Sequence, residues 1–176
     1  MRLEYKNIII RNATKDDAWQ LSKWWNDGKV MEHAGWPLGT GQTANEIAEK
    51  IKTDDDFTHR RLMIEYDHQP IGETNYRNIG SNCAEIGIKI CDFSMQNKGL
   101  GKIILSMLID SLFNDFHFDK IVLDTNLNNK RAQHVYEQLG FRKLRTNIDS
   151  WKDQLGNLQS SVDYELLPHQ FKNYKQ

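Results

Sequence analysis

The segment Gln96–Gly101 has the composition of a backbone site for an anion. It reads Gln-Asn-Lys-Gly-Leu-Gly and directly precedes a stretch, Ile103 to Leu112, in which apolar residues recur at helical spacing. The first turn of a helix leaves backbone N–H groups unpaired and carries partial positive charge, and glycine lets a ligand approach that backbone closely. A phosphate or pyrophosphate group is therefore the ligand that this segment could bind.

The residues before this segment form the strand that should position it. From Ala84 to Cys91, apolar residues alternate with Glu85, Gly87 and Lys89, which is the pattern of a half-buried strand. Strand, glycine turn and helix follow one another as in nucleotide-binding loops, but neither G-x-G-x-x-G nor G-x-x-x-x-G-K-[ST] is present. Taken alone, the glycines could equally form a tight turn without a ligand.

A second segment, Asn129–Phe141, carries a tyrosine on a predicted helix. The helix covers 130–139, Asn129 stands at the position of its N-cap, and Gly140-Phe141 opens the next strand. Together with the Gln-x-x-Gly-x-Gly segment, this order of Asn, Ala, Tyr and Gly-Phe resembles the GNAT superfamily of N-acetyltransferases. The resemblance covers residue 8 to about residue 167. It is greatest to the branch that contains the ribosomal-protein N-terminal acetyltransferases.

The resemblance implies that the glycine segment binds the pyrophosphate of acetyl-CoA. Tyr136 would then lie beside the coenzyme A sulfur as the general acid, and Asn129 would be a polar residue on the coenzyme A side. In the family the strand at 84–91 splays from its neighbour, so its backbone N–H groups are implied to contact the pantetheine and the acyl oxygen. The implied acetyl-CoA contacts are Ile88, Ile90, Cys91, Gln96, Asn97, Lys98, Gly99, Leu100, Gly101, Lys102, Asn129 and Arg131.

Three of these residues also have other possible roles. Tyr136 could be a core side chain on the buried face of its helix, and Asn129 could simply cap that helix. Cys91 could in principle form an acyl-enzyme, although direct transfer is the family's usual route.

Acyl transfer to an amine also requires that the amine lose a proton. Glu85 is the first candidate for the general base, because partial burial would make its carboxylate a stronger base. Glu73, on the neighbouring predicted strand, is the second candidate. Ordered water could also carry the proton, so the base stays open between these three.

The acceptor should contact the stretch Gly28–Gly41, which holds four glycines and a proline together with His33 and Trp36. We expect this stretch to be an ordered functional loop. With Glu73, these two side chains could bind a cationic amine through charge and cation–π contacts. An aromatic residue is more often core, and a loop histidine is as often bonded to backbone. The sequence does not separate a peptide N-terminus from a polyamine, an aminoglycoside or an amino acid.

Composition limits the other functions. With 176 residues the chain can bury one sizeable core, and we expect a single domain over 1–176. The net charge is −1, and Lys and Arg are scattered, which argues against a nucleic-acid or membrane partner. No signal peptide and no run of 18 apolar residues is present, so we expect a cytoplasmic protein. Cys83 and Cys91 should be free thiols, and the six scattered histidines predict no metal site.

The element order predicts the fold class. Three successive antiparallel strands are followed by strands that helices connect, which is typical of an α+β fold with a single mixed, twisted, mostly antiparallel sheet. We expect six to seven strands and about four helices. The expected strands are 8–11, 61–66, 71–77, 84–91, 120–125, 141–148 and 160–166, and the helices begin at Thr14, Thr43, Leu100 and Lys130.

These observations lead to one expected function and one alternative. We expect an acetyl-CoA-dependent N-acetyltransferase that moves an acetyl group to a primary amine by direct transfer in a ternary complex. The acceptor would be a small amine, an antibiotic or a peptide N-terminus. The alternative is a non-catalytic acyl-CoA-binding regulator. The exposed edges of the hairpin at 141–166 could pair two subunits as a homodimer.

Overall fold

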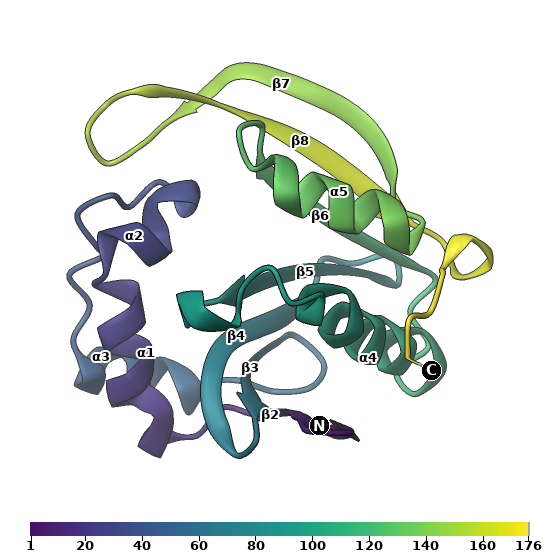
Figure 1. Ribbon diagram of the computed structural model, residues 1–176, viewed down its shortest axis with the longest axis horizontal. Helices are drawn as coiled ribbons and strands as arrows, with labels where there is room; N and C mark the ends of the chain where they lie inside the picture. Colours follow the sequence, from purple (N-terminus) through teal and green to yellow (C-terminus); the bar gives the residue numbers. More distant parts are fainter. Residues whose placement is uncertain (176) are drawn as a thin grey trace.

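In the computed structural model, which describes residues 1–175, eight strands form one twisted sheet (Figure 1). The order across the sheet is β1-β2-β3-β4-β5-β6-β8-β7, and every neighbouring pair is antiparallel except β5 and β6. The strands are β1 (Arg2–Tyr5), β2 (Ile8–Asn12), β3 (His59–Tyr66), β4 (Gln69–Asn78), β5 (Cys83–Ile90), β6 (Lys120–Asn126), β7 (Arg142–Lys152) and β8 (Leu158–Leu166). The predicted α+β class with a mixed, mostly antiparallel sheet is confirmed.

Helices cover both faces of this sheet (Figure 1). On one face, α4 and α5 share a core with Ile10, Ile64 and Ile86, while on the other α1 and α3 pack against Met63 and Cys91. The two sets of residues alternate along their strands, as a sheet buried on both faces requires. The α-helices are α1 (Ala18–Trp25), α2 (Gly28–Met31), α3 (Ala44–Ile51), α4 (Leu100–Asn114) and α5 (Lys130–Leu139), and the short 3-10 turns are η1 (Lys15–Asp17), η2 (Glu32–Ala34), η3 (Phe93–Met95) and η4 (Pro168–Gln170).

The described chain has eight strands and five α-helices, one or two strands and one helix more than expected. The additional elements are β1, which pairs with β2 at the edge of the sheet, and α2, a single turn inside the stretch predicted as a functional loop. Neither carries an apolar pattern long enough to be recognised from sequence. Within residues 1–175 no helix has the length and apolar character to span a membrane.

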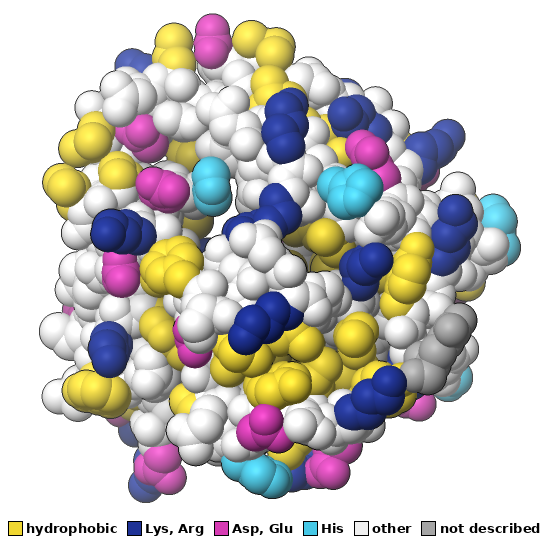
Figure 2. All heavy atoms as spheres, viewed as in Figure 1, with side chains coloured by type: hydrophobic (Ala, Val, Ile, Leu, Met, Phe, Trp, Pro, Cys, Tyr) yellow, Lys and Arg dark blue, Asp and Glu magenta, His cyan; other side chains and the backbone are white. Residues whose placement is uncertain are grey.

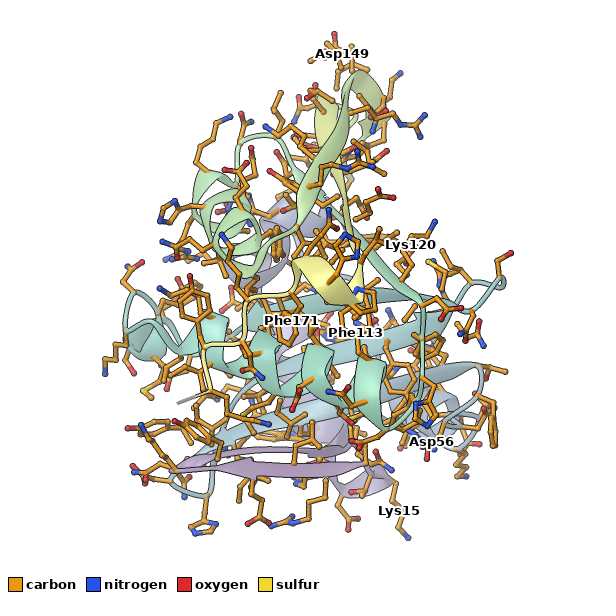
Figure 3. The ribbon with its side chains drawn as sticks, turned by 90° about the vertical axis from the view of Figure 1, so that its right-hand side faces the viewer. Lys15, Asp56, Phe113, Lys120, Asp149 and Phe171 are labelled. Atoms are coloured by element: carbon orange, nitrogen blue, oxygen red, sulfur yellow. The ribbon has the colours of Figure 1, made fainter. Side chains whose placement is uncertain are left out.

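The C-terminal segment packs along α4. The rings of Phe113 in α4 and Phe171 lie edge to face with centroids 6.1 Å apart (Figure 3). Further along, the backbone N–H of Tyr174 donates to the Ser106 hydroxyl, 2.9 Å away. The segment thus runs along α4 back to its first turn, where Lys102 Nζ lies 4.7 Å from the centroid of the Tyr174 ring.

The sheet is open at its centre because β5 and β6 diverge. They pair only where Cys83–Glu85 meet Lys120–Val122. Beyond that point β5 stays paired with β4 as far as Ile90, and β6 stays paired with β8 as far as Asn126. The facing backbone edges of the two strands are therefore left without each other as partners, and a ligand or water must satisfy them.

Candidate active site

A cavity of about 900 Å³ lies at the gap between β5 and β6. Its walls come from α4 and α5 on one face of the sheet and from α2 and η2 on the other. In Figure 2 the viewed face is hollowed near its centre, and a histidine and dark blue Lys or Arg side chains lie beside the hollow. Because the cavity reaches both faces, two ligands can meet in it from opposite sides of the sheet.

The first turn of α4 forms an anion cradle in the cavity wall. Gly99 is the N-cap and has a φ of 75°, a left-handed conformation that glycine adopts without the steric cost of a Cβ. Gly101 lies in the first turn, and a Cβ added there would meet no atom within 4 Å. The open backbone N–H groups of this turn therefore have room for a phosphate group, with the positive end of a 15-residue helix behind them.

The turn before α4 is held from two sides. The Gln96 side chain donates from Nε2 to the Ile90 carbonyl oxygen, 2.8 Å away, which ties the turn to β5. Arg131, at the start of α5, donates to Gln96 Oε1 at 2.8 Å and to Asn97 Oδ1 at 3.4 Å. The cradle is thus ordered by side-chain contacts, and a guanidinium charge stands beside it.

On α5, Asn129 and Tyr136 both line the cavity. Asn129 is also the N-cap of α5, since its Oδ1 accepts from the Ala132 backbone N–H at 3.2 Å. Tyr136 is only 6% exposed, and its ring packs edge to face on Phe141 and Tyr164 with centroids 5.8 Å apart in each pair. Tyr136 is thus a core residue and a cavity residue at once.

The Tyr136 hydroxyl has no hydrogen-bond partner among residues 1–175 and is free to bind a ligand atom. Burial, and to a smaller degree the negative charge of Asp124, raises the pKa of Tyr136 above its ordinary value. The phenol therefore keeps its proton throughout the neutral pH range, as a general acid must.

The two candidate bases lie outside the cavity wall. Glu85 accepts a hydrogen bond from Arg77 Nη2 at 2.6 Å. Glu73 is buried and accepts from Trp25 Nε1 at 2.7 Å, with Lys89 Nζ 3.5 Å away. Both carboxylates are thus occupied by partners of opposite charge or by donors in the sheet and α1.

Three other predicted contacts also lie outside the cavity wall. The backbone N–H of Cys91 donates to the Ile71 carbonyl oxygen at 2.8 Å, so it is not free for an acyl oxygen. The Cys91 thiol is buried against α1 and α3, and burial raises its pKa, which makes it a poor nucleophile. Lys98 is exposed with its Nζ 3.7 Å from Met95 Sδ, and Trp36 is 42% exposed.

The structure brings most of the predicted residues together. The cavity wall contains His33, Ile88, Ile90, Gln96, Asn97, Gly99, Leu100, Gly101, Lys102, Asn129, Arg131 and Tyr136. They come from five separate elements or turns of the chain, which only the tertiary fold unites.

The wall residues that sequence reasoning did not assign include Asp124, Asn126, Trp151 and Ser161. Asp124 and Asn126 alternate with buried Leu123 on β6, so the period of two could have placed them on the open face. Trp151 has no such signal. It reaches the cavity because the β7–β8 hairpin packs on the loop after α2, more than a hundred residues away in the chain.

Gln154, in the turn of that hairpin, fastens it to this loop. Its backbone N–H donates to the Gly35 carbonyl oxygen at 2.8 Å. Its side chain accepts from the Leu38 N–H at 2.9 Å and donates to the Gly39 carbonyl oxygen at 3.0 Å. In Figure 1 the end of the β7–β8 hairpin lies beside α2, on the side of the molecule away from α4. Trp151 from the hairpin and His33 from the α2 loop both line the cavity.

Comparison with known proteins gives a consistent result. Residues 7–142 match a family model described as an acetyltransferase (GNAT) domain. The chain is 26% identical over 155 residues to an aminoglycoside N(6')-acetyltransferase type 1 from Klebsiella pneumoniae, covering 80% of this chain and 76% of that protein.

Solved structures share the fold. A spermidine N-acetyltransferase from Vibrio cholerae, in complex with CoA and spermine, superimposes with a TM-score of 0.83 at 22% identity over 94% of this chain and 98% of the other. A ribosomal L7/L12 alpha-N-protein acetyltransferase in complex with coenzyme A gives a TM-score of 0.82 at 14% identity over 95% and 98%. The chain therefore has the same overall fold as these two proteins.

Proposed function

The chain belongs to the GNAT acetyltransferase family and is an acetyl-CoA-dependent N-acetyltransferase, and we propose that the cavity between β5 and β6 is where it transfers the acetyl group to a primary amine. The observation that carries this proposal is the continuity of the cavity. It joins the anion cradle of α4 and the Tyr136 hydroxyl on one face to the α2 loop on the other. Acetyl-CoA and the acceptor would approach from these two sides and form a ternary complex, with the chain working as one domain.

On the acetyl-CoA side, the backbone of residues 99–102 would bind the pyrophosphate, and Arg131 would add positive charge beside it. The unpaired edge of β5 at Ile88 and Ile90 would bind the pantetheine amides and donate to the acyl oxygen. Gln96 and Asn97 would act by holding this turn in place, and Lys98 and Lys102 by their charge.

The bond changes define the role of Tyr136. The neutral amine attacks the thioester carbonyl, a C–N bond forms, the C–S bond breaks, and the sulfur leaves as a thiolate that needs a proton. The Tyr136 hydroxyl, which is free of protein partners in the described chain, would donate to this sulfur. A thiol, with a pKa of about 8.5, is a stronger acid than the phenol, so the tyrosinate left behind is a strong enough base to take a proton back from the attacking nitrogen or from water as coenzyme A departs.

On the acceptor side we keep His33 as a direct contact, because it lines the cavity. Glu73, Glu85 and Trp36 lie outside the wall, so any part they take would be indirect, as when Glu73 holds Trp25 and Lys89. The relatives named above act on aminoglycosides, spermidine and a ribosomal protein. We infer that the acceptor here is likewise a primary amine that is cationic in water.

We also propose a cytoplasmic location and a homodimer. Cys83 and Cys91 are both free thiols, which a reducing compartment such as the cytosol preserves. The outer edge of β7 has no partner strand within residues 1–175, and two subunits could pair there. Sedimentation at two protein concentrations tests the pairing, and a single monomer boundary at both would contradict it.

The test of the proposed function is release of free thiol from acetyl-CoA in the presence of amines. Spermidine, kanamycin and a short peptide with a free N-terminus would be supplied separately to the purified protein. Amine-dependent release with at least one of them is expected. If acetyl-CoA raised the melting temperature but no amine gave turnover, the regulator alternative would replace the enzyme; absence of both binding and turnover would overturn the site itself.

A further inference from the structure

Three carboxylates form a row across the open face of the sheet beside the cavity. Asp124 on β6 lies directly opposite Asp163 on β8. Glu85 on β5 pairs with Val122, two residues before Asp124, and therefore points to the same face as Asp124. This face also carries Met63 and Cys91 under α1 and α3, so it is the side from which the acceptor would come.

Only the middle carboxylate of this row lacks a partner within residues 1–175. Glu85 accepts from Arg77 Nη2 at 2.6 Å, and Asp163 accepts from Arg145 Nε at 2.7 Å and Asn147 Nδ2 at 3.0 Å. Asp124 makes no side-chain hydrogen bond or ion pair in the described chain, and it lines the cavity. A carboxylate between two others attracts a cation, because each neighbour adds negative potential at its oxygens.

We propose that Asp124 binds the ammonium group of the acceptor and takes its proton before the amine attacks the thioester. This inference rests on the proposed function and names the group that the acceptor amine contacts. The other carboxylate that lines the cavity in residues 1–175 is Glu32, whose side chain is 59% exposed on η2 with His33 Nε2 4.0 Å away. Both carboxylates are exposed, but Glu32 belongs to a short 3-10 turn, whereas Asp124 lies on β6, the strand that borders the gap.

The position of Asp124 suits an acid–base pair with Tyr136. Asp124 on β6 and Tyr136 on α5 line the same cavity from opposite faces of the sheet, and the negative charge of Asp124 contributes to the raised pKa of Tyr136. Partial burial raises the pKa of Asp124, and the charges of Glu85 and Asp163 raise it further. A carboxylate with a raised pKa is a better proton acceptor near neutral pH.

The protons balance across one turnover. An ammonium group gives one proton to the Asp124 carboxylate, and the neutral amine then forms the C–N bond. The nitrogen loses a second proton after attack, which replaces the one that Tyr136 gives to the thiolate. Asp124 returns its proton to water once the amide has left. The net products are the acetylated amine, coenzyme A as the thiol, and one proton.

Several charged groups face Asp124 and would shape its titration. Glu85 lies beside it on β5 and Asp163 on β8, while Tyr136 approaches from α5. Across the same cavity the other charged or titratable side chains are Lys29, Glu32, His33, Lys89, Lys102, Arg131 and His134. The acceptor's own amine also titrates, so the pH profile must be compared between variants with the same acceptor.

The test is the pH profile of kcat/KM for Asp124→Asn, with the acceptor that wild type uses in the thiol-release assay. The variant should lose roughly 10²–10⁴-fold in kcat/KM, the usual contribution of a positioned base, and lose the acid limb that wild type shows. Its affinity for coenzyme A should not change. Asp149→Asn is the matched control, because Asp149 is exposed at the outer end of β7 (Figure 3) and already has a φ of 49° that Asn tolerates.

A second variant keeps the carboxylate and changes only its surroundings. Asp163→Asn removes a neighbouring negative charge, so the acid limb should move to lower pH while most of kcat remains. Wild-type activity and an unchanged acid limb in Asp124→Asn, or an unmoved limb in Asp163→Asn, would each overturn the role of Asp124. If wild type itself acetylates none of the amines, the proposed function fails instead, and the two failures are thereby distinguished.

Discussion

At the residue scale, Tyr136 shows why one side chain can have a structural and a chemical role together. Its ring is part of the core with Phe141 and Tyr164, which fixes the orientation of the phenol. Its hydroxyl lines the cavity and lacks a protein partner in residues 1–175. The two roles suggested by the sequence are therefore compatible, since the core contacts hold the acid in place.

Tyr136→Phe tests the acid role without disturbing the core. The aromatic contacts remain, so the melting temperature and the dissociation constant for coenzyme A should stay close to wild type. The value of kcat should fall roughly 10²–10⁴-fold, because no group remains to protonate the thiolate. Steady-state kinetics and calorimetric titration measure the two quantities.

Tyr164→Phe is the matched control for this change. Tyr164 lies against Tyr136, but its hydroxyl donates to Glu137 Oε1 at 3.0 Å. Its loss should cost about 1 kcal/mol of stability and leave kcat largely intact. Equal activity in Tyr136→Phe and Tyr164→Phe would remove Tyr136 from the acid role.

The raised pKa of Asp124 should also affect how the stability of the protein depends on pH. A carboxyl whose pKa is raised in the folded state favours folding when protonated and opposes folding when ionised. Asp124→Asn should therefore melt no lower than wild type at neutral pH. If the variant melts higher than wild type at neutral pH, this difference should shrink as the pH falls through the raised pKa of folded Asp124. It should vanish below the ordinary carboxyl pKa of about 3.9, where the carboxyl is protonated in both states. Melting scans from pH 4 to pH 8 check this, and a variant that melts well below wild type at neutral pH would contradict it.

At the element scale, the first turn of α4 offers a substitution with two opposite expected effects. Gly101→Ala should stabilise the ligand-free protein by up to about 0.4–1 kcal/mol, because alanine has fewer unfolded conformations and the site has space for a Cβ. The same methyl group fills part of the cradle, so affinity for coenzyme A should fall about tenfold or more. Thermal melting and calorimetric titration measure the two effects.

Asn114→Ala, at the other end of α4, is the control for helix substitutions, because Asn114 is exposed and far along the helix from the cradle. It should leave coenzyme A affinity at the wild-type value. Wild-type affinity in Gly101→Ala as well would mean that the pyrophosphate does not contact this turn.

Elements with local patterns were predictable from the sequence. The start of α4, both ends of α5 and both ends of β5 agree with expectation within one residue, since apolar periodicity and the glycines at 99 and 140 mark them. The divergence of β5 from β6 has no local signal and was implied only by the family resemblance. The positions of Glu85 and Glu73 were equally hidden, because their partners Arg77 and Trp25 depend on register and on the packing of α1.

At the scale of the whole molecule, the acceptor side of the cavity depends on a contact between distant parts of the chain. Gln154 in the β7–β8 turn bonds to Leu38 and Gly39 through its side chain. The same hairpin brings the Trp151 ring against Gly35, where an added Cβ would lie 2.5 Å from it. The loop that carries His33 is thus held in place by the β7–β8 hairpin, which forms the far edge of the sheet.

Gln154→Ala should make the loop at residues 35–39 more mobile and leave the coenzyme A side of the cavity unchanged. Two hydrogen bonds of about 1 kcal/mol each would be lost, so amide exchange protection of residues 35–39 should fall by roughly tenfold or more. The acceptor KM should rise while the affinity for coenzyme A stays unchanged. Hydrogen exchange and initial-rate kinetics measure these, with Leu155→Ala, an exposed neighbour in the same turn, as control. If the affinity for coenzyme A changed and the acceptor KM did not, the assignment of this loop to the acceptor side of the cavity would be contradicted.

The most direct test of the whole account is a crystal structure of the protein with acetyl-CoA. We predict the pyrophosphate on the backbone N–H groups of residues 99–102, the pantetheine along β5 in its gap with β6, and the thioester sulfur at hydrogen-bonding distance from the Tyr136 hydroxyl. The acyl carbon should face the side that carries Asp124. A pyrophosphate bound elsewhere, or a thioester on the far side of α5 from Tyr136, would contradict the account.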